Sequence, residues 1–334
     1  MFSSKTKLVD EMVHRDTMKK IVFCLLLVIN VIAASSQTEM QISQYMFQHP
    51  VINPAAVGES GMIQVSGLHH LQWVGVRNAG NTTLFSVNTP LKFSEKSLHG
   101  AGLKFRNDVA GQYYFQNAHL QYAYKKKISQ GTFSAGIDIG FVNVGFRGDS
   151  VNLSEIPFGD YHASTSEDLF IPSTDVSGMG FDMSVGVWYS SPKFYVGAAY
   201  LNLTQPNLYW TDQREYKLKS VFNFTGGYNW RFEDPKFLLK PSVLLKTDFV
   251  SMQVDVSANL EYDNKYWGGL AYRLQDAVVI LAGIRTPIGL NLGYSFDIPT
   301  SKIGGWGSHE LSLVYEFEYV FEKHKNKYKS IRIL

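Results

Sequence analysis

Three short clusters in the sequence contain residue types that could do chemistry. Gly58-Glu59-Ser60-Gly61 comes nearest to a nucleophile motif, but it lacks the spacing of a hydrolase elbow. His69 and His70 could each assist a serine, yet adjacent residues on a strand face opposite sides and cannot serve one site. Gly159-Asp160-Tyr161-His162 lacks metal-ligand spacing. We therefore predict no catalytic, cofactor-binding or metal site, and interpret the clusters as a turn, surface histidines and a solvated loop.

The elements that carry these residues are indicated by alternation of apolar and polar residues after residue 60. In residues 252–262 the even-numbered positions are apolar, and the polar positions between them are Gln253, Asp255, Ser257, Asn259 and Glu261. A period of two is typical of a strand with one apolar and one polar face. A soluble sandwich and a membrane barrel both alternate in this way, so alternation does not separate the two classes.

Segment length favours the membrane barrel. Segments of about ten residues match a tilted bilayer crossing, whereas strands of soluble proteins average about five or six residues. The predicted fold class is all-β, a transmembrane antiparallel up-and-down β-barrel of about fourteen strands. The predicted strands span residues 62–73, 82–91, 98–108, 111–126, 131–145, 178–190, 193–203, 216–231, 236–248, 250–262, 265–274, 276–285, 287–296 and 307–320.

Connection lengths and aromatic residues agree with this class. Bacterial barrels alternate short periplasmic turns with longer outer loops, and aromatic residues gather at the membrane interfaces. Outward Tyr and Trp residues cluster near the ends of even-numbered strands, as at Tyr122, Tyr124, Tyr228 and Trp230. The longest predicted connections all follow odd-numbered strands, at residues 74–81, 146–177, 204–215 and 297–306.

The chain divides into four regions. Residues 1–36 are predicted to be a signal peptide region, because Lys19 and Lys20 precede an apolar run and small residues, with Met18 as an alternative initiator. Residues 37–60 are predicted to be a periplasmic N-terminal segment that packs at the barrel mouth or enters the lumen, with a disordered leader as the alternative. Residues 61–321 form the predicted barrel, and residues 322–334 a basic C-terminal tail. The net charge of +2 gives no electrostatic basis for nucleic-acid binding.

Several motifs resemble a known family. The first are Gln41-Ile42-Ser43-Gln44-Tyr45-Met46-Phe47 and Ile52-Asn53-Pro54-Ala55-Ala56-Val57-Gly58, followed by Leu71-Gln72-Trp73-Val74-Gly75 and Gly100-Ala101-Gly102-Leu103. In this order they resemble the PorP/SprF family of type IX secretion and gliding. The resemblance covers the mature chain in length and strand rhythm, but its specific motifs lie within about residues 41–145.

The resemblance implies a non-enzymatic outer-membrane barrel that anchors cell-surface proteins or assists their export. Its implied partners are an exported surface protein or adhesin, a periplasmic secretion-system or cell-wall-linked protein, and membrane lipids, with no cofactor and no nucleic acid. The alternatives are a passive or hydrophobic-solute channel and an outer-membrane hydrolase. Polar residues of the lumen face either line a channel or plug the barrel. The partner-binding candidates are Tyr45, Phe47, Asn53, Pro54, Trp73, Phe158, Tyr161 and Phe170.

Overall fold

The computed structural model describes residues 40–94, 97–148, 172, 174–211, 214–300 and 305–318. The signal region, the basic tail 322–334 and the loop residues Phe158, Tyr161 and Phe170 lie outside the described residues. Predictions about them therefore stay predictions.

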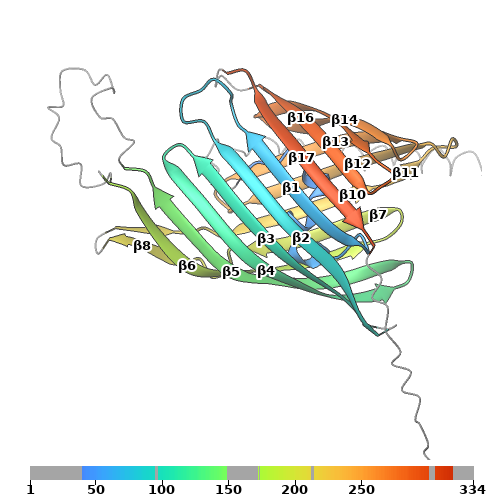
Figure 1. Cartoon of the computed structure of the whole chain (residues 1–334), viewed down its shortest axis with the longest axis horizontal. Coiled ribbons are helices and arrows are strands. Elements are labelled where there is room, and N and C mark those ends of the chain that lie inside the picture. Colours follow the sequence, from blue (N-terminus) through green and yellow to red (C-terminus); the bar gives the residue numbers. More distant parts are fainter. Residues whose placement is uncertain are drawn as a thin grey trace, which may run out of the picture.

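The strands form one closed antiparallel barrel (Figure 1). Consecutive strands pair along the chain, and the pairing of β1 with β17 and of β10 with β12 closes the sheet. β10 and β11 both pair with β12 and are separated only by Asn229, so together they act as one strand of the wall. The barrel therefore has 14 strands, which confirms the predicted fold class.

The observed bounds of the wall strands lie within a few residues of the predicted ones, apart from the start of β10. They are β1 Ile63–Leu71, β2 Asn81–Ser94, β3 Ser97–Ala110, β4 Tyr113–Ile128, β5 Gly131–Phe146, β6 Val176–Ser190, β7 Phe194–Leu201, β10 Val221–Tyr228, β11 Trp230–Arg231, β12 Phe237–Thr247, β13 Met252–Tyr262, β14 Tyr266–Arg273, β15 Ala277–Arg285, β16 Leu290–Pro299 and β17 Ser308–Phe317.

The connections between strands define the two ends of the barrel. We call the end with residues 129–130, 191–193, 232–236, 263–265 and 286–289 the turn end, because its connections are short. The opposite end, the loop end, has the long connections 72–80, 147–175, 202–220 and 300–307 together with some short ones. The longest connections thus share one end, as their parity in the sequence predicted.

One connection differs from the prediction. The segment after β7 contains a separate hairpin, β8 Asn207–Thr211 and β9 Arg214–Lys217, where we predicted a loop and the start of a wall strand at residue 216. The hairpin is held against the wall by an apolar cluster rather than by strand pairing with it. Leu208 and Leu218 pack there with Phe115, Val142 and Val144. This packing delays the wall strand β10 to Val221.

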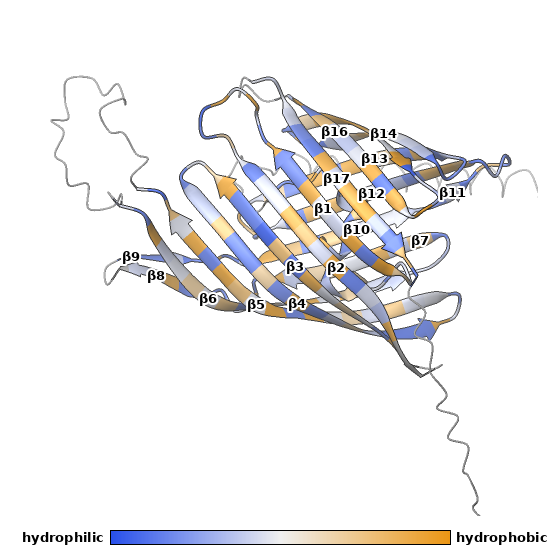
Figure 2. Ribbon diagram, in the orientation of Figure 1, coloured by the Kyte–Doolittle hydropathy of each residue, from blue (hydrophilic) through white to orange (hydrophobic). Residues whose placement is uncertain are grey.

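Burial in the wall is the reverse of burial in a soluble protein. Val256 on β13 is 52% exposed, whereas its neighbour Ser257 is 2% exposed. Leu120, Phe141, Leu270 and other large apolar side chains point outward, while Asp, Asn, Glu and Arg residues are buried inside. The alternation is visible along the strands in Figure 2. An apolar exterior around a polar interior is the arrangement of a barrel that faces lipid, and it excludes the soluble sandwich.

The helical elements are short and precede the first strand. They are η1 Tyr45–Phe47, α2 His49–Ile52 and η2 Pro54–Ala56, drawn in dark blue inside the barrel in Figure 1. Among the described residues, no helix is long and apolar enough to cross a membrane.

Candidate functional site

The lumen of the barrel is occupied by residues 40–60, which we call the lumen segment. Its first residues lie at the loop end, because the Met40 carbonyl accepts a hydrogen bond from Lys246 and the Gln41 side chain accepts one from Gln72. Its last residues, Glu59 and Ser60, lie at the turn end, where the chain continues into β1. The segment therefore passes through the barrel from one end to the other. Of the two positions predicted for it, the structure shows the lumen.

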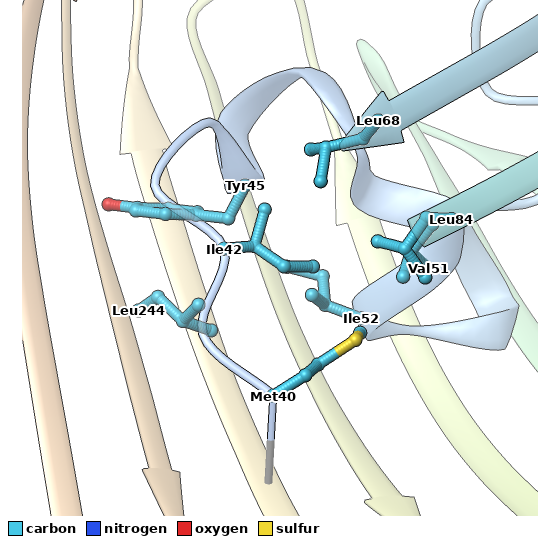
Figure 3. Packing of buried hydrophobic residues seen from close by; sticks show 8 residues of the cluster. All are labelled: Met40, Ile42, Tyr45, Val51, Ile52, Leu68, Leu84 and Leu244. Atoms are coloured by element: carbon cyan, nitrogen blue, oxygen red, sulfur yellow. The ribbon is translucent and has the colours of Figure 1, made fainter. Parts of the chain in front are cut away.

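Apolar side chains hold the middle of the lumen segment. Tyr45 is 1% exposed and packs with wall residues that face inward (Figure 3). Its hydroxyl lies 3.0 Å from Ser242 Oγ and 3.4 Å from Ser257 Oγ. The whole cluster comprises Met40, Ile42, Tyr45, Val51, Ile52, Leu68, Leu84 and Leu244.

A buried carboxylate on the last strand binds the backbone of the lumen segment. Glu310 on β17 is fully buried and accepts hydrogen bonds from the N–H groups of Ser43 and Gln44, both at 2.8 Å. His70 Nδ1 lies 3.2 Å from the same carboxylate. Hydrogen bonds to a charged acceptor are stronger than neutral ones. Glu310 therefore fixes the path of the segment before η1.

An arginine links the segment to the neighbouring strands of the wall. Arg273 Nε donates to Asp255 at 3.0 Å, its Nη1 donates to Asp297 at 3.0 Å, and its Nη2 donates to Ser43 Oγ at 3.0 Å. Its side chain is only 3% exposed. A buried charge is tolerated when it is paired and hydrogen-bonded on several sides, and here the segment supplies one of the partners. Polar residues of the wall thus serve the segment as well as one another.

The second half of the segment is fixed through Asn53. Its Nδ2 donates to the carbonyls of Val187 at 3.0 Å and Ala198 at 3.2 Å, and its Oδ1 caps η2 by accepting from the N–H of Ala55. The backbone of the segment here touches the wall at glycines. A Cβ on Gly136 would lie 2.5 Å from Ala55 Cα, so only glycine allows this approach.

Glu59 closes the segment at the turn end. Its carboxylate lies 3.0 Å from His49 Nδ1 and accepts a 3.0 Å hydrogen bond from Trp188 Nε1. Burial alone would raise the pKa of Glu59, but His49, Trp188 and the charge of Lys125 together hold it below its usual value. Glu59, in the cluster Gly58–Gly61, therefore has a structural role: it joins a turn to His49 and Trp188.

The structure brings four of the predicted partner-binding candidates together. Tyr45, Phe47, Asn53 and Pro54 all belong to the lumen segment; Phe47 packs against Trp267 with ring centroids 4.5 Å apart. Trp73 lies apart from them at the loop end, where its backbone N–H donates to Ser308 Oγ at 3.0 Å. Partner binding by any of these residues stays a prediction.

The two adjacent histidines face opposite sides, as strand geometry predicts. His69 is exposed and lies 2.9 Å from Thr83 Oγ1, whereas His70 is buried beside Glu310. The interpretation of both as surface histidines is therefore wrong for His70, which faces the lumen. Sequence reasoning identified the lumen-facing Asp255 and Asn259 but missed Glu310 and Arg273 as partners of the segment. The alternation of the strands places Glu310 and Arg273 on the polar face. It could not show that both bind Ser43, which lies 230 or more residues away in the sequence.

This architecture, with lipid-facing apolar side chains, a polar interior and a wall sheet that closes on itself, defines an outer-membrane β-barrel. A family model for the type IX secretion system membrane protein PorP/SprF matches residues 34–315. The chain belongs to this family, as its motifs predicted.

The chain is also similar to solved structures of other proteins. The translocator domain of the autotransporter NalP from Neisseria meningitidis is 12% identical, with 82% of this chain and 96% of that chain covered and a TM-score of 0.42. The Acinetobacter baumannii outer membrane protein Omp33 is 7% identical, with coverage of 77% and 98% and a TM-score of 0.45. The Ralstonia pickettii toluene transporter TbuX is 11% identical, with coverage of 81% and 93% and a TM-score of 0.45. None of the curated proteins matches the chain.

Proposed function

We propose that this outer-membrane barrel anchors exported proteins at the cell surface or assists their export, and that it does so without catalysing a reaction. The observation that carries the proposal is the occupied lumen: residues 40–60 bury apolar and polar side chains along the full height of the barrel. A barrel filled in this way offers its two ends as binding surfaces rather than a passage between them. Membership of a secretion family supports the same role.

The loop end carries a surface suited to an exported protein. By the usual orientation of bacterial barrels, longer loops face the outside. Two loops are joined there by backbone hydrogen bonds, from Val74 N–H to the Gly307 carbonyl at 2.8 Å and from Trp306 N–H to the Val74 carbonyl at 2.9 Å. Trp306 is 80% exposed on this pair of loops. An exposed tryptophan on loops that are fixed by hydrogen bonds is a typical centre for protein recognition.

The test compares Trp306→Ser with Ile288→Ser in cells that depend on this protein. Ile288 is 69% exposed but lies at the turn end, so it controls for loss of an exposed apolar side chain. Trp306→Ser is expected to reduce the exported protein that co-purifies after gentle solubilisation and that is labelled on intact cells. Ile288→Ser is expected to change neither.

A second measurement separates this proposal from a channel. Purified protein in a planar bilayer is expected to show no steady ion conductance. Steady conductance in the unmodified protein, together with normal surface display in the Trp306 variant, would favour the channel instead.

A further inference from the structure

A cavity of about 270 Å³ lies at the turn end, between the lumen segment and the wall. Met46, Phe47 and His49 of the segment form one side, and β12, β13 and β16 contribute to the other. Ser191 and Asn229, from turns and strand ends, border it, so it reaches the mouth of the barrel. At about 30 Å³ for each water, it has room for roughly nine waters or the end of one extended chain. It lies opposite the proposed cargo surface.

The cavity contains a buried amide without partners. Asn259 on β13 is 1% exposed and lines the cavity, and neither its Oδ1 nor its Nδ2 makes a hydrogen bond. Buried polar side chains are nearly always hydrogen-bonded, so such an orphan indicates a missing partner. A primary amide offers one acceptor and one donor side by side. This pair is complementary to the N–H and C=O of a peptide.

Two cations lie beside this amide and share one carboxylate oxygen. Lys240, the cross-strand neighbour of Asn259, donates to Glu261 Oε1 at 2.6 Å, and Arg285 Nη2 donates to the same atom at 3.5 Å. Their side chains are 32% and 33% exposed. A lysine has three donors and an arginine five, so most of their donors remain for an incoming anion.

The other charged groups of the cavity are already engaged. Glu59 binds His49 and Trp188, and Glu316 Oε1 accepts a hydrogen bond from Gln64 at 2.9 Å. Glu59 belongs to the lumen segment and Glu316 to β17, whereas Lys240 and Asn259 form a pair across β12 and β13. The cavity is therefore cationic on the Lys240 side and carries its free amide on that same side.

We propose that this cavity binds the carboxyl-terminal end of an extended peptide. The terminal carboxylate would lie between Lys240 and Arg285, and Asn259 would pair with the last peptide group. The last side chain would contact Met46, Phe47 and Pro241, which give the cavity its apolar wall. The same chemistry occurs at the end of a protein chain and at the end of a cell-wall stem peptide, and the probes below distinguish these two sources.

The test is titration calorimetry on the full chain in detergent with three probes. They are acetyl-Ala-Ala-Leu with a free carboxylate, the same peptide as its C-terminal amide, and acetyl-Lys-D-Ala-D-Ala. At least one free acid is expected to bind ten times more tightly than the amide. Preference for the L-peptide assigns a protein end, and preference for the D-peptide assigns a stem peptide. No binding up to millimolar peptide, or equal binding of acid and amide, overturns the proposal.

Variants locate the binding. Asn259→Leu removes the amide at similar size, and Lys240→Met and Arg285→Met each remove one partly exposed cation. Each is expected to weaken binding of the preferred acid at least tenfold. Lys265→Met is the matched control, because Lys265 lies at the same end but pairs with Asp263 outside the cavity. If Asn259→Leu does not fold, binding to Lys240→Met and Arg285→Met tests the site instead. Unchanged binding in the folded variants overturns the assignment of the site.

Discussion

The position of the lumen segment depends strongly on Glu310, which makes Glu310→Gln an informative change. The substitution keeps the shape of the side chain but turns one acceptor oxygen into a donor. One of the N–H groups of Ser43 and Gln44, now at 2.8 Å from the carboxylate, then loses its acceptor. A hydrogen bond to a charged group contributes about 1.5–3 kcal/mol. At 1.4 kcal/mol per factor of ten, this predicts a rise of roughly 10- to 150-fold in the fraction of molecules with a released segment.

Thiol labelling measures this fraction. The only cysteine is Cys24, so Val51→Cys in a Cys24→Ser chain gives one reporter inside the barrel. Val51 is 2% exposed and should react with a maleimide only when the segment leaves the lumen. Glu310→Gln is expected to speed labelling by the factor above, whereas Glu318→Gln, at an exposed position, should not. Unchanged labelling in a barrel that still migrates as folded protein in unheated gels would refute the role given to Glu310.

Three further changes test the wall and the segment. Val256→Arg places a charge on the lipid face and should destabilise the barrel by about 2–4 kcal/mol near the midplane, measured by urea unfolding in lipid. Glu233→Arg, at an exposed position of the connection 232–236, should have little effect. Gly136→Val should displace the backbone near Ala55 and speed labelling of the Val51→Cys reporter. A Cβ added at Gly67 has no neighbour within 4 Å, so Gly67→Val should leave the labelling rate unchanged. Because the pKa of Glu59 is lowered on folding from 4.5, its contribution to stability is present above pH 4.5 and is lost as the pH falls through the folded value. Maleimide reacts with the thiolate, so the labelling rate is divided by that of the unfolded chain at the same pH. This relative rate should rise at low pH in the parent and rise less in Glu59→Gln. A Glu59→Gln barrel with the same acid response as the parent would contradict that assignment.

Most of the wall was readable from the sequence, because each strand repeats a local pattern. The period of two in residues 252–262 gives the lipid face and the lumen face directly, and β13 runs from Met252 to Tyr262 as that pattern predicts. The hairpin β8–β9 was not readable, because its order depends on Leu208 and Leu218 packing against β4 and β5. The local sequence pattern does not show packing against strands that are distant in the sequence.

The site was only partly readable for the same reason. The motif around Tyr45 predicted that the lumen segment packs against the barrel, since aromatic residues are scarce in disordered segments. Its anchors are distant in sequence, however, as with Lys246 and Met40 at a separation of 206 residues. The orphaned amide of Asn259 could not be seen from sequence at all, because a missing partner is a property of packing.

The route of the lumen segment has a consequence for the order of assembly. Ser43, near the start of the described chain, and Glu310, on the last strand, are 267 residues apart and are joined by a hydrogen bond inside the wall. β17 also pairs with β1, which directly follows the segment. Closing the sheet and surrounding the segment are therefore one event, and contacts of this sequence separation form slowly. A chain whose first and last strands joined without the segment between them would bury Glu310 beside His70 but without its two backbone donors, and the cost of those two missing hydrogen bonds favours reopening of the seam.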